Sequence, residues 1–259
     1  MTADVKAVLL DVDGTLVDTN YLHAVTWWEA FAQAGYDVPM AAIHHAIGME
    51  SDRMLDALLP AGRDAGADSD IKTSHSALYS VYWPRLRPLP GAARLLRACH
   101  DRGLRVVLAS SADPHELDVL RAALDADDAI DAATSSGDAE AGKPCPDPVR
   151  VALGQAGAGP AESVFIGDSV WDVHACRKAG VPCIGLLTGG TSRAELDGAG
   201  AVAVYDGPAD LLDSFPARLN AAAQPGTAGT RARAGWLALA ARHHQARPGS
   251  MRASPTSGR

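Results

Sequence analysis

The chain is short of the features that mark secreted and membrane proteins. Its 259 residues include four cysteines, which lie far apart and form no CxxC pair (Cys99, Cys145, Cys176 and Cys183). A disulfide framework or a zinc site is therefore not expected. The cysteines are expected to be small buried thiols in a protein of a reducing compartment. No apolar run reaches the length of about 18 residues that a membrane helix needs, and the start, MTADVKAVLLDVDGT, is too acidic for a signal peptide. These absences predict a cytoplasmic protein with no membrane partner.

Acidic residues are absent from the C-terminal stretch and in excess elsewhere. Residues 226–259 hold six arginines and no acid, whereas residues 1–225 carry 17 bases against 31 acids. So negative a body excludes nucleic-acid binding through bulk charge, and an anionic partner needs a local positive site. The stretch 221–259, rich in Ala, Gly, Pro, Arg and Ser, is expected to be a flexible basic tail with at most one short helix over 236–244.

Short β-rich runs alternate with helical patterns along the rest of the chain. The runs are 5–10, 104–109, 130–134, 164–167, 183–187 and 201–204, and the clearest helical patterns are 114–124, 146–156, 170–179 and 208–219. Strands that alternate with helices predict an α/β fold, a doubly wound Rossmann-like parallel sheet with helices on both faces. Ligands of such sheets bind at the carboxyl ends of the strands, so the chemistry is expected just after the apolar runs.

One interval is too long for a simple crossover between strands. Residues 20–85 show helical patterns, such as 21–34 and 43–59, and no convincing strand. We therefore expect a helical cap at 20–85 and a core domain made of 1–19 and 86–220. Trp27 and Trp28 are expected to pack in the interior and hinge of that cap.

Two carboxylates follow the first apolar run. Asp11 and Asp13 are two residues apart, so both point the same way from a strand end, and Gly14 permits a tight turn after them. Carboxylates this close repel each other unless a cation lies between them. A hard ion with oxygen ligands, Mg²⁺ above all, would remove the repulsion.

Further polar residues follow the later runs. Ser110 and Ser111 come after 104–109, Lys143 stands in a Gly-Lys-Pro loop, and Asp168 and Asp172 come after 164–167. Taken singly, each has an ordinary structural role, as a helix cap or a solvated loop charge. Together at one sheet edge they predict a site for an anion and a metal ion.

At this point the sequence resembles a known family. The segments DVDGTLVDT, LAS, GKP and IGDSVWD are similar, in order and spacing, to the four motifs of the haloacid dehalogenase superfamily, over about residues 5–215. The helical insertion after the first motif resembles the cap of its first subfamily, which includes phosphoglycolate phosphatase-like enzymes, sugar-phosphate phosphatases and β-phosphoglucomutase. The resemblance implies a small phosphorylated metabolite as the partner, and the chain is expected to be a monomer or a homodimer.

The resemblance also implies roles for the catalytic residues. Asp11 would attack phosphorus and form an aspartyl-phosphate, and Asp13 would serve as general acid and base. Ser110 would bind a phosphoryl oxygen, and Lys143 would neutralise the charge of the nucleophile and the phosphoryl group. Cations are needed because a carboxylate is a poor nucleophile toward a phosphate dianion.

A metal-ligand set is implied as well. Mg²⁺ would be held by the carboxylates of Asp11 and Asp168 and the backbone carbonyl of Asp13, with Asp172 supporting the metal waters or orienting the lysine.

Phosphatase and mutase chemistry are the closest alternatives. A mutase of this subfamily carries a cap arginine for a second phosphate, where this chain has Ser51, although Arg53 is near. It also carries a lysine where this chain has Asp113. Both differences favour the phosphatase. A non-catalytic binding module on the same fold is disfavoured because the nucleophile and the metal acids are all present.

The remaining expectations concern substrate contacts. Ser111, His23 and Arg53 are candidate substrate-binding residues, with His23 alternatively a packed helix residue. No histidine shows a metal-binding spacing with the acids, and the histidines are expected on the cap surface and in the tail. Lys72, the only lysine in 20–85, is expected to lie far from the first cap helix, which argues against an enzyme that forms a Schiff base there.

Overall fold

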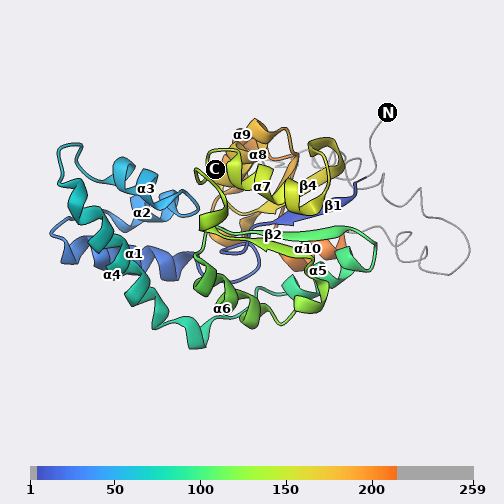
Figure 1. Cartoon of the computed structure of the whole chain (residues 1–259), viewed down its shortest axis with the longest axis horizontal. Helices are drawn as coiled ribbons and strands as arrows, with labels where there is room; N and C mark the ends of the chain where they lie inside the picture. Colours follow the sequence, from blue (N-terminus) through green and yellow to red (C-terminus); the bar gives the residue numbers. More distant parts are fainter. Residues whose placement is uncertain (1–4, 215–259) are drawn as a thin grey trace, which may run out of the picture.

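Six parallel strands form a single sheet in the computed structural model, which describes residues 5–214 (Figure 1). The order of the strands is β3-β2-β1-β4-β5-β6. Their bounds are Ala7–Leu10 (β1), Arg105–Ala109 (β2), Ala132–Thr134 (β3), Ser163–Gly167 (β4), Cys183–Leu186 (β5) and Ala203–Tyr205 (β6). The chain runs outward from β1 in one direction and then from β4 in the other, which confirms the doubly wound α/β fold.

Helices cover both faces of the sheet, which explains why most strand residues are apolar. Val8 and Leu10 belong to an apolar cluster on one face, and Ala7 and Leu9 to the cluster on the other. The helices of the core are α5 (Ala92–His100), α6 (Pro114–Leu124), α7 (Asp147–Ala156), α8 (Val170–Ala179), α9 (Arg193–Ala199) and α10 (Pro208–Asp213). Residues of α5, α6 and α10 pack in the first cluster, and residues of α7, α8 and α9 in the second.

Residues 20–85, which we call the cap, contain helices and no strand in the structure. The helices are α1 (Asn20–Gln33), α2 (Met40–Ala46), α3 (Ser51–Leu58) and α4 (Asp68–Ser80), and they lie to one side of the sheet (Figure 1). They enclose a separate apolar cluster that includes Trp27, Phe31 and Ile43. Trp28, expected in the interior, is instead 40% exposed. The domain boundaries at 19/20 and 85/86 stay a prediction.

Gly48 interrupts the long helical stretch that the sequence predicts over 43–59. It adopts φ +89°, and a Cβ there would lie 2.9 Å from Ser169 Oγ in the core. A left-handed glycine stops α2 and lets the chain pass close to the core before α3 begins. The expected helix 208–219 ends at Asp213, and the basic tail with its helix over 236–244 lies outside the described residues.

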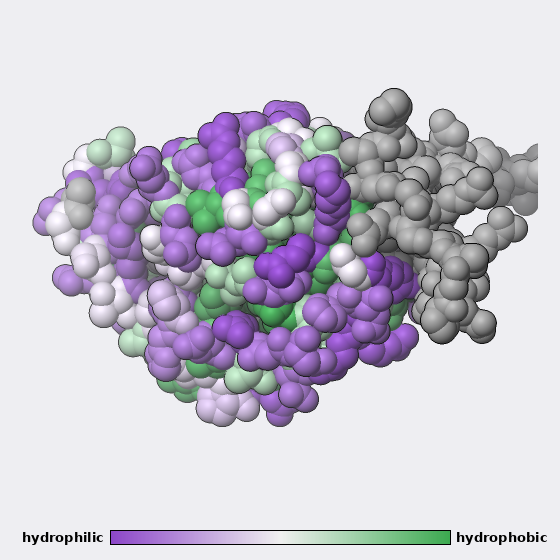
Figure 2. Space-filling model, turned by 45° about the vertical axis from the view of Figure 1, so that its right-hand side comes forward, coloured by the Kyte–Doolittle hydropathy of each residue, from purple (hydrophilic) through white to green (hydrophobic). Residues whose placement is uncertain are grey.

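The distribution of hydrophilic residues on the surface and the burial of the cysteines are those of a globular protein. Hydrophilic residues cover most of the face in Figure 2, with hydrophobic residues in smaller areas between them. Cys99, Cys176 and Cys183 are buried and Cys145 is half-buried, and all four are free. Among the described residues, no helix is both long enough and apolar enough to cross a membrane.

Candidate active site

The predicted site residues converge at one edge of the sheet because their strands are neighbours. Leu10 of β1 pairs with Ile166 of β4, and the N–H of Asp11 donates to the carbonyl of Ile166 at 2.9 Å. Asp11 and Asp168 therefore leave adjacent strands side by side. Asp172 follows in the first turn of α8.

Lys143 is buried among carboxylates. Its Nζ lies 2.8 Å from Asp11 Oδ1 and 2.8 Å from Asp172 Oδ1, and its side chain is 1% exposed. Burial lowers the pKa of Lys143, but the charges and hydrogen bonds of Asp11 and Asp172 outweigh burial and hold that pKa above its ordinary value. The side chain is therefore a fixed ammonium beside the Asp11 carboxylate.

Three buried carboxylates share this corner. Oxygens of Asp11, Asp168 and Asp172 all lie within 4.8 Å of one another. Burial raises the pKa of Asp11 well above its ordinary value; Lys143 opposes this, and Asp172 and Asp168 add to it. Burial, and then the charge of Asp172, raises the pKa of Asp168 to about 7. A single ammonium cannot neutralise three acids, and an oxygen-only ligand set of this charge fits Mg²⁺.

Asp168 is held in place by its neighbours. Thr15 Oγ1 donates to Asp168 Oδ1 at 2.7 Å, and Asn20 Nδ2, at the start of α1, donates to Asp168 Oδ2 at 2.8 Å. A Cβ at Gly189 would lie 1.7 Å from Asp168 Oδ2, so only glycine permits the loop after β5 to approach this closely. These contacts orient the carboxylate as the partners of metal ligands do.

Asp13 has a different environment. Thr19 Oγ1 donates to Asp13 Oδ1 at 2.7 Å, and His23 Nε2 lies 3.3 Å from the same oxygen. Burial raises the pKa of Asp13, but the hydrogen bond and charge of His23, with Thr19, outweigh it and lower that pKa. Burial lowers the pKa of His23, but Asp13 and Glu116 outweigh it and raise that pKa. These shifts favour a carboxylate on Asp13 beside a protonated His23.

A cavity of about 280 Å³ joins these residues to the cap. Ser111 lines it, whereas Ser110 is buried and its Oγ accepts a hydrogen bond from the N–H of Ala112 at 3.0 Å. The core side is lined by Asp11, Asp13, Ser111, Asp113, Glu116, Ser136, Lys143 and Asp168. The acids, the lysine and the two serines thus face one cavity.

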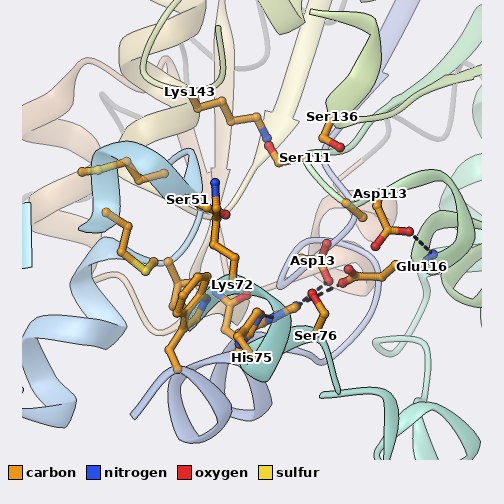
Figure 3. A pocket seen from close by; sticks show the side chains of 18 of the residues that line it. Asp13, Ser51, Lys72, His75, Ser76, Ser111, Asp113, Glu116, Ser136 and Lys143 are labelled. Carbon is orange, nitrogen blue, oxygen red and sulfur yellow. Dashed lines mark hydrogen bonds and ion pairs between the residues drawn. The ribbon is translucent and has the colours of Figure 1, made fainter. Parts of the chain in front are cut away.

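The cap supplies the opposite wall of the cavity, but Arg53, the cap residue expected to bind substrate, is not part of it. Arg53 is half exposed and contacts Glu50 at 3.3 Å and Cys145 Sγ at 3.2 Å, outside the cavity lining. Lys72 lines the cavity instead, and Figure 3 shows its side chain directed from α4 into it. The expectation that Lys72 lies far from the first cap helix is wrong, because α4 packs along α1.

The expectation that the histidines lie on the cap surface or in the tail is wrong for the buried His75, and also for the core histidines His100 (α5), His115 (α6) and His174 (α8). His75 is buried, stacked on Trp27 at 4.0 Å, and burial, then the charge of His23, lowers its pKa well below the ordinary value. His23 stands within ligand distance of acids, at 3.3 Å from Asp13 and 3.6 Å from Glu116. Sequence spacing concealed this, because the three residues come from different elements.

Comparison with known proteins agrees with this arrangement. The family model for haloacid dehalogenase-like hydrolases matches residues 5–180. Protein SUPPRESSOR OF QUENCHING 1, chloroplastic, of Arabidopsis thaliana is 30% identical over 191 residues, which cover 71% of this chain and 18% of that longer protein. A phosphoglycolate phosphatase of Rhodospirillum rubrum is 29% identical over 82% of this chain and 92% of its own length. The crystal structure of a hydrolase from Pseudomonas syringae has a TM-score of 0.77 at 31% identity and covers 85% of this chain and 100% of its own.

Proposed function

Because this chain belongs to the haloacid dehalogenase-like hydrolase family and is a phosphatase, we propose that it hydrolyses a small phosphate monoester, of the phosphoglycolate or sugar-phosphate kind, through an aspartyl-phosphate with Mg²⁺. The observation that carries the proposal is the contact of Asp11 with the buried Lys143 at the wall of a small cavity. The cytoplasmic location and the monomeric or homodimeric state belong to the same proposal.

Asp11 acts as the nucleophile. Its carboxylate oxygen forms a bond to phosphorus as the bond from phosphorus to the ester oxygen breaks. Lys143 stays protonated beside it, and Ser111 and the buried Ser110 end the neighbouring strand, where phosphoryl oxygens would lie.

Asp13 and His23 carry out the two proton transfers of the reaction. The proton held by His23 passes through Asp13 to the departing ester oxygen, which leaves as an alcohol. Asp13 then takes a proton from water, whose oxygen attacks phosphorus and releases the Asp11 carboxylate. Thr19 and His23 hold the Asp13 carboxylate in position for both steps.

Mg²⁺, held by Asp11, Asp168 and the Asp13 carbonyl, would screen the charge on the phosphoryl group. Asp172 would support that site through Lys143. The fit rests on three buried carboxylates, two of which contact the ammonium of Lys143, and the described residues supply no second ion pair to them.

The test is phosphate release from a panel of phosphate monoesters that includes phosphoglycolate and hexose phosphates. Asp11→Asn should stay folded and lose about a thousandfold or more of kcat/KM. Asp18→Asn, which changes an exposed acid of the same loop, is the matched control and should retain activity. A chelator should abolish turnover and added Mg²⁺ restore it. Activity of Asp11→Asn close to that of the control would contradict the covalent mechanism, and no release from any ester would favour a binding module.

A further inference from the structure

A second group of metal-ligating atoms lies at the wall of the same cavity. Asp13, His23 and Glu116 each offer one atom, and these three atoms lie within 4.8 Å of one another. They come from the loop after β1, from α1 of the cap and from α6 of the core, and all three line the cavity. Figure 3 labels Asp13 and Glu116. We propose that these side chains form an inhibitory binding site for a divalent transition-metal ion, of which Zn²⁺ is the representative.

The distances fit a bound ion as well as the long hydrogen bond from His23 to Asp13. His23 Nε2 lies 3.3 Å from Asp13 Oδ1 and 3.6 Å from Glu116 Oε1. Adjacent ligand atoms on tetrahedral Zn²⁺ are about 3.3–3.4 Å apart when the bonds to the metal are about 2.0–2.1 Å long. Good N–H···O hydrogen bonds span about 2.7–3.2 Å, and one proton on Nε2 cannot serve two carboxylates at once.

The hydrogen bonds behind His23 turn the correct nitrogen toward the acids. Thr26 Oγ1 lies 2.9 Å from the carbonyl of Leu22 and 3.1 Å from His75 Nδ1. If Thr26 gives its one proton to the carbonyl of Leu22 or of His23, which can only accept, His75 Nδ1 donates to Thr26.

This assignment continues along the chain of contacts. His75 Nε2 is then an acceptor, and it lies 3.4 Å from His23 Nδ1, which therefore donates to it. When His23 is neutral, its remaining nitrogen, Nε2, presents a lone pair to Asp13 and Glu116. Ring orientation by a hydrogen bond on the opposite nitrogen is the usual support for a histidine that binds a metal.

The ligand types separate this site from the magnesium site. Asp11, Asp168 and Asp172 offer only oxygen, which suits Mg²⁺, whereas an imidazole with two carboxylates suits Zn²⁺, Mn²⁺ or Co²⁺. The two negative charges balance a divalent ion. An ion bound here would occupy Asp13 and His23 and stop their proton transfer. Only this inhibition rests on the proposed function, because the binding itself requires no catalysis.

The binding test uses Co²⁺, whose visible spectrum reports its coordination, added to the full chain in saturating Mg²⁺. The wild type should bind Co²⁺ with the intense bands of a four- or five-coordinate ion, and Zn²⁺ should displace it. Glu116→Gln and His23→Gln should each weaken binding at least about tenfold. Asp113→Asn removes the charge of an acid that lines the same cavity and is not one of the three ligands. Asparagine can still accept the hydrogen bonds from the N–H groups of His115 and Glu116 that cap α6, so the variant should leave binding unchanged.

The second arm excludes Zn²⁺ at the magnesium site. Asp168→Asn removes an acid of that site and should keep the Co²⁺ bands. In saturating Mg²⁺, Zn²⁺ should inhibit the wild type and Asp113→Asn at the same concentration, and Glu116→Gln only at a concentration at least about tenfold higher. The proposal would be overturned if Co²⁺ bound equally well to the wild type, Glu116→Gln and His23→Gln. It would also be overturned if Co²⁺ binding were lost in Asp168→Asn alone. Circular dichroism of each variant confirms that it is folded.

Discussion

The N–H of Glu50, at the start of α3, donates to the backbone carbonyl of Lys143 at 3.0 Å. The Glu50 side chain accepts a hydrogen bond from the N–H of Gly142, also at 3.0 Å. A residue of the cap thus holds the loop that carries the buried lysine, so the position of the cap and the position of the ammonium are coupled.

We expect Glu50→Ala to lower kcat by about tenfold, because a small displacement of Lys143 weakens its alignment with Asp11. Glu50→Gln keeps an oxygen that accepts from Gly142 and is the matched control, expected near wild-type activity. Steady-state kinetics on both variants give the answer. Equal kcat for the two variants would show that the side-chain contact does not position the loop.

Removing the buried ammonium should destabilise the fold. In Lys143→Met, Asp11 and Asp172 lose their shared cation and remain buried, which costs about 3–5 kcal/mol of unfolding free energy. Urea denaturation measures the loss. Adding Asp172→Asn to the same protein removes one of the stranded charges, so the double variant should be more stable than Lys143→Met. A double variant that is less stable would show that Asp172 contributes mainly through its contacts with Ser169.

The pH dependence of stability should reveal the raised pKa of Asp168. Its pKa is about 7 in the folded protein against an ordinary value of 3.8. Between these values the folded, chelator-treated protein binds more protons than the unfolded chain, so its free energy of unfolding falls as the pH rises and levels off above about 7.

Urea denaturation at a series of pH values in EDTA measures this fall. The fall in the free energy of unfolding should be smaller in Asp168→Asn, which has no titrating carboxyl at this position. It should also be smaller in the wild type with saturating Mg²⁺. An identical slope in the variant and the wild type, both in EDTA, would contradict the assignment of this group.

We expect water, and not a sugar hydroxyl, to receive the phosphoryl group. A mutase must hold a second phosphate, but Lys143 is engaged by two acids and Lys72 by Asp52 at 2.7 Å. Asp113 and Glu116 add negative charge to the cavity wall. With β-glucose 1-phosphate and a trace of the 1,6-bisphosphate, inorganic phosphate should form. Rapid formation of glucose 6-phosphate with negligible phosphate release would reverse this conclusion.

Sequence reasoning locates the residues whose positions follow from the sheet. Asp11, Ser110 and Asp168 come directly after apolar runs, and parallel strands bring their carboxyl ends to one edge. Helical periodicity likewise identifies α6 and α8 with their observed bounds. In both cases the prediction rests on a local sequence pattern, and the topology of the sheet determines how these residues come together.

The residues that sequence reasoning missed depend on how one element packs against another. Glu116 and Lys72 lie on helices whose rotation toward the cavity is fixed by tertiary contacts, and neither has a motif of its own. His75 reaches His23 only because α4 packs along α1, across 52 residues of sequence. The Arg53 expectation failed to place that side chain in the cavity because α3 turns it toward Glu50 and Cys145.

The close approach of Gly189 to Asp168 also limits how the gene can change. A Cβ at position 189 would lie 1.7 Å from Asp168 Oδ2 and 2.5 Å from Asn20 Nδ2. Every missense change of a glycine codon introduces a side chain with a Cβ, so each one displaces either the loop after β5 or the Asp168 carboxylate. A descendant that keeps this arrangement around Asp168 must therefore keep glycine at 189, unless residue 20 or 168 changes with it.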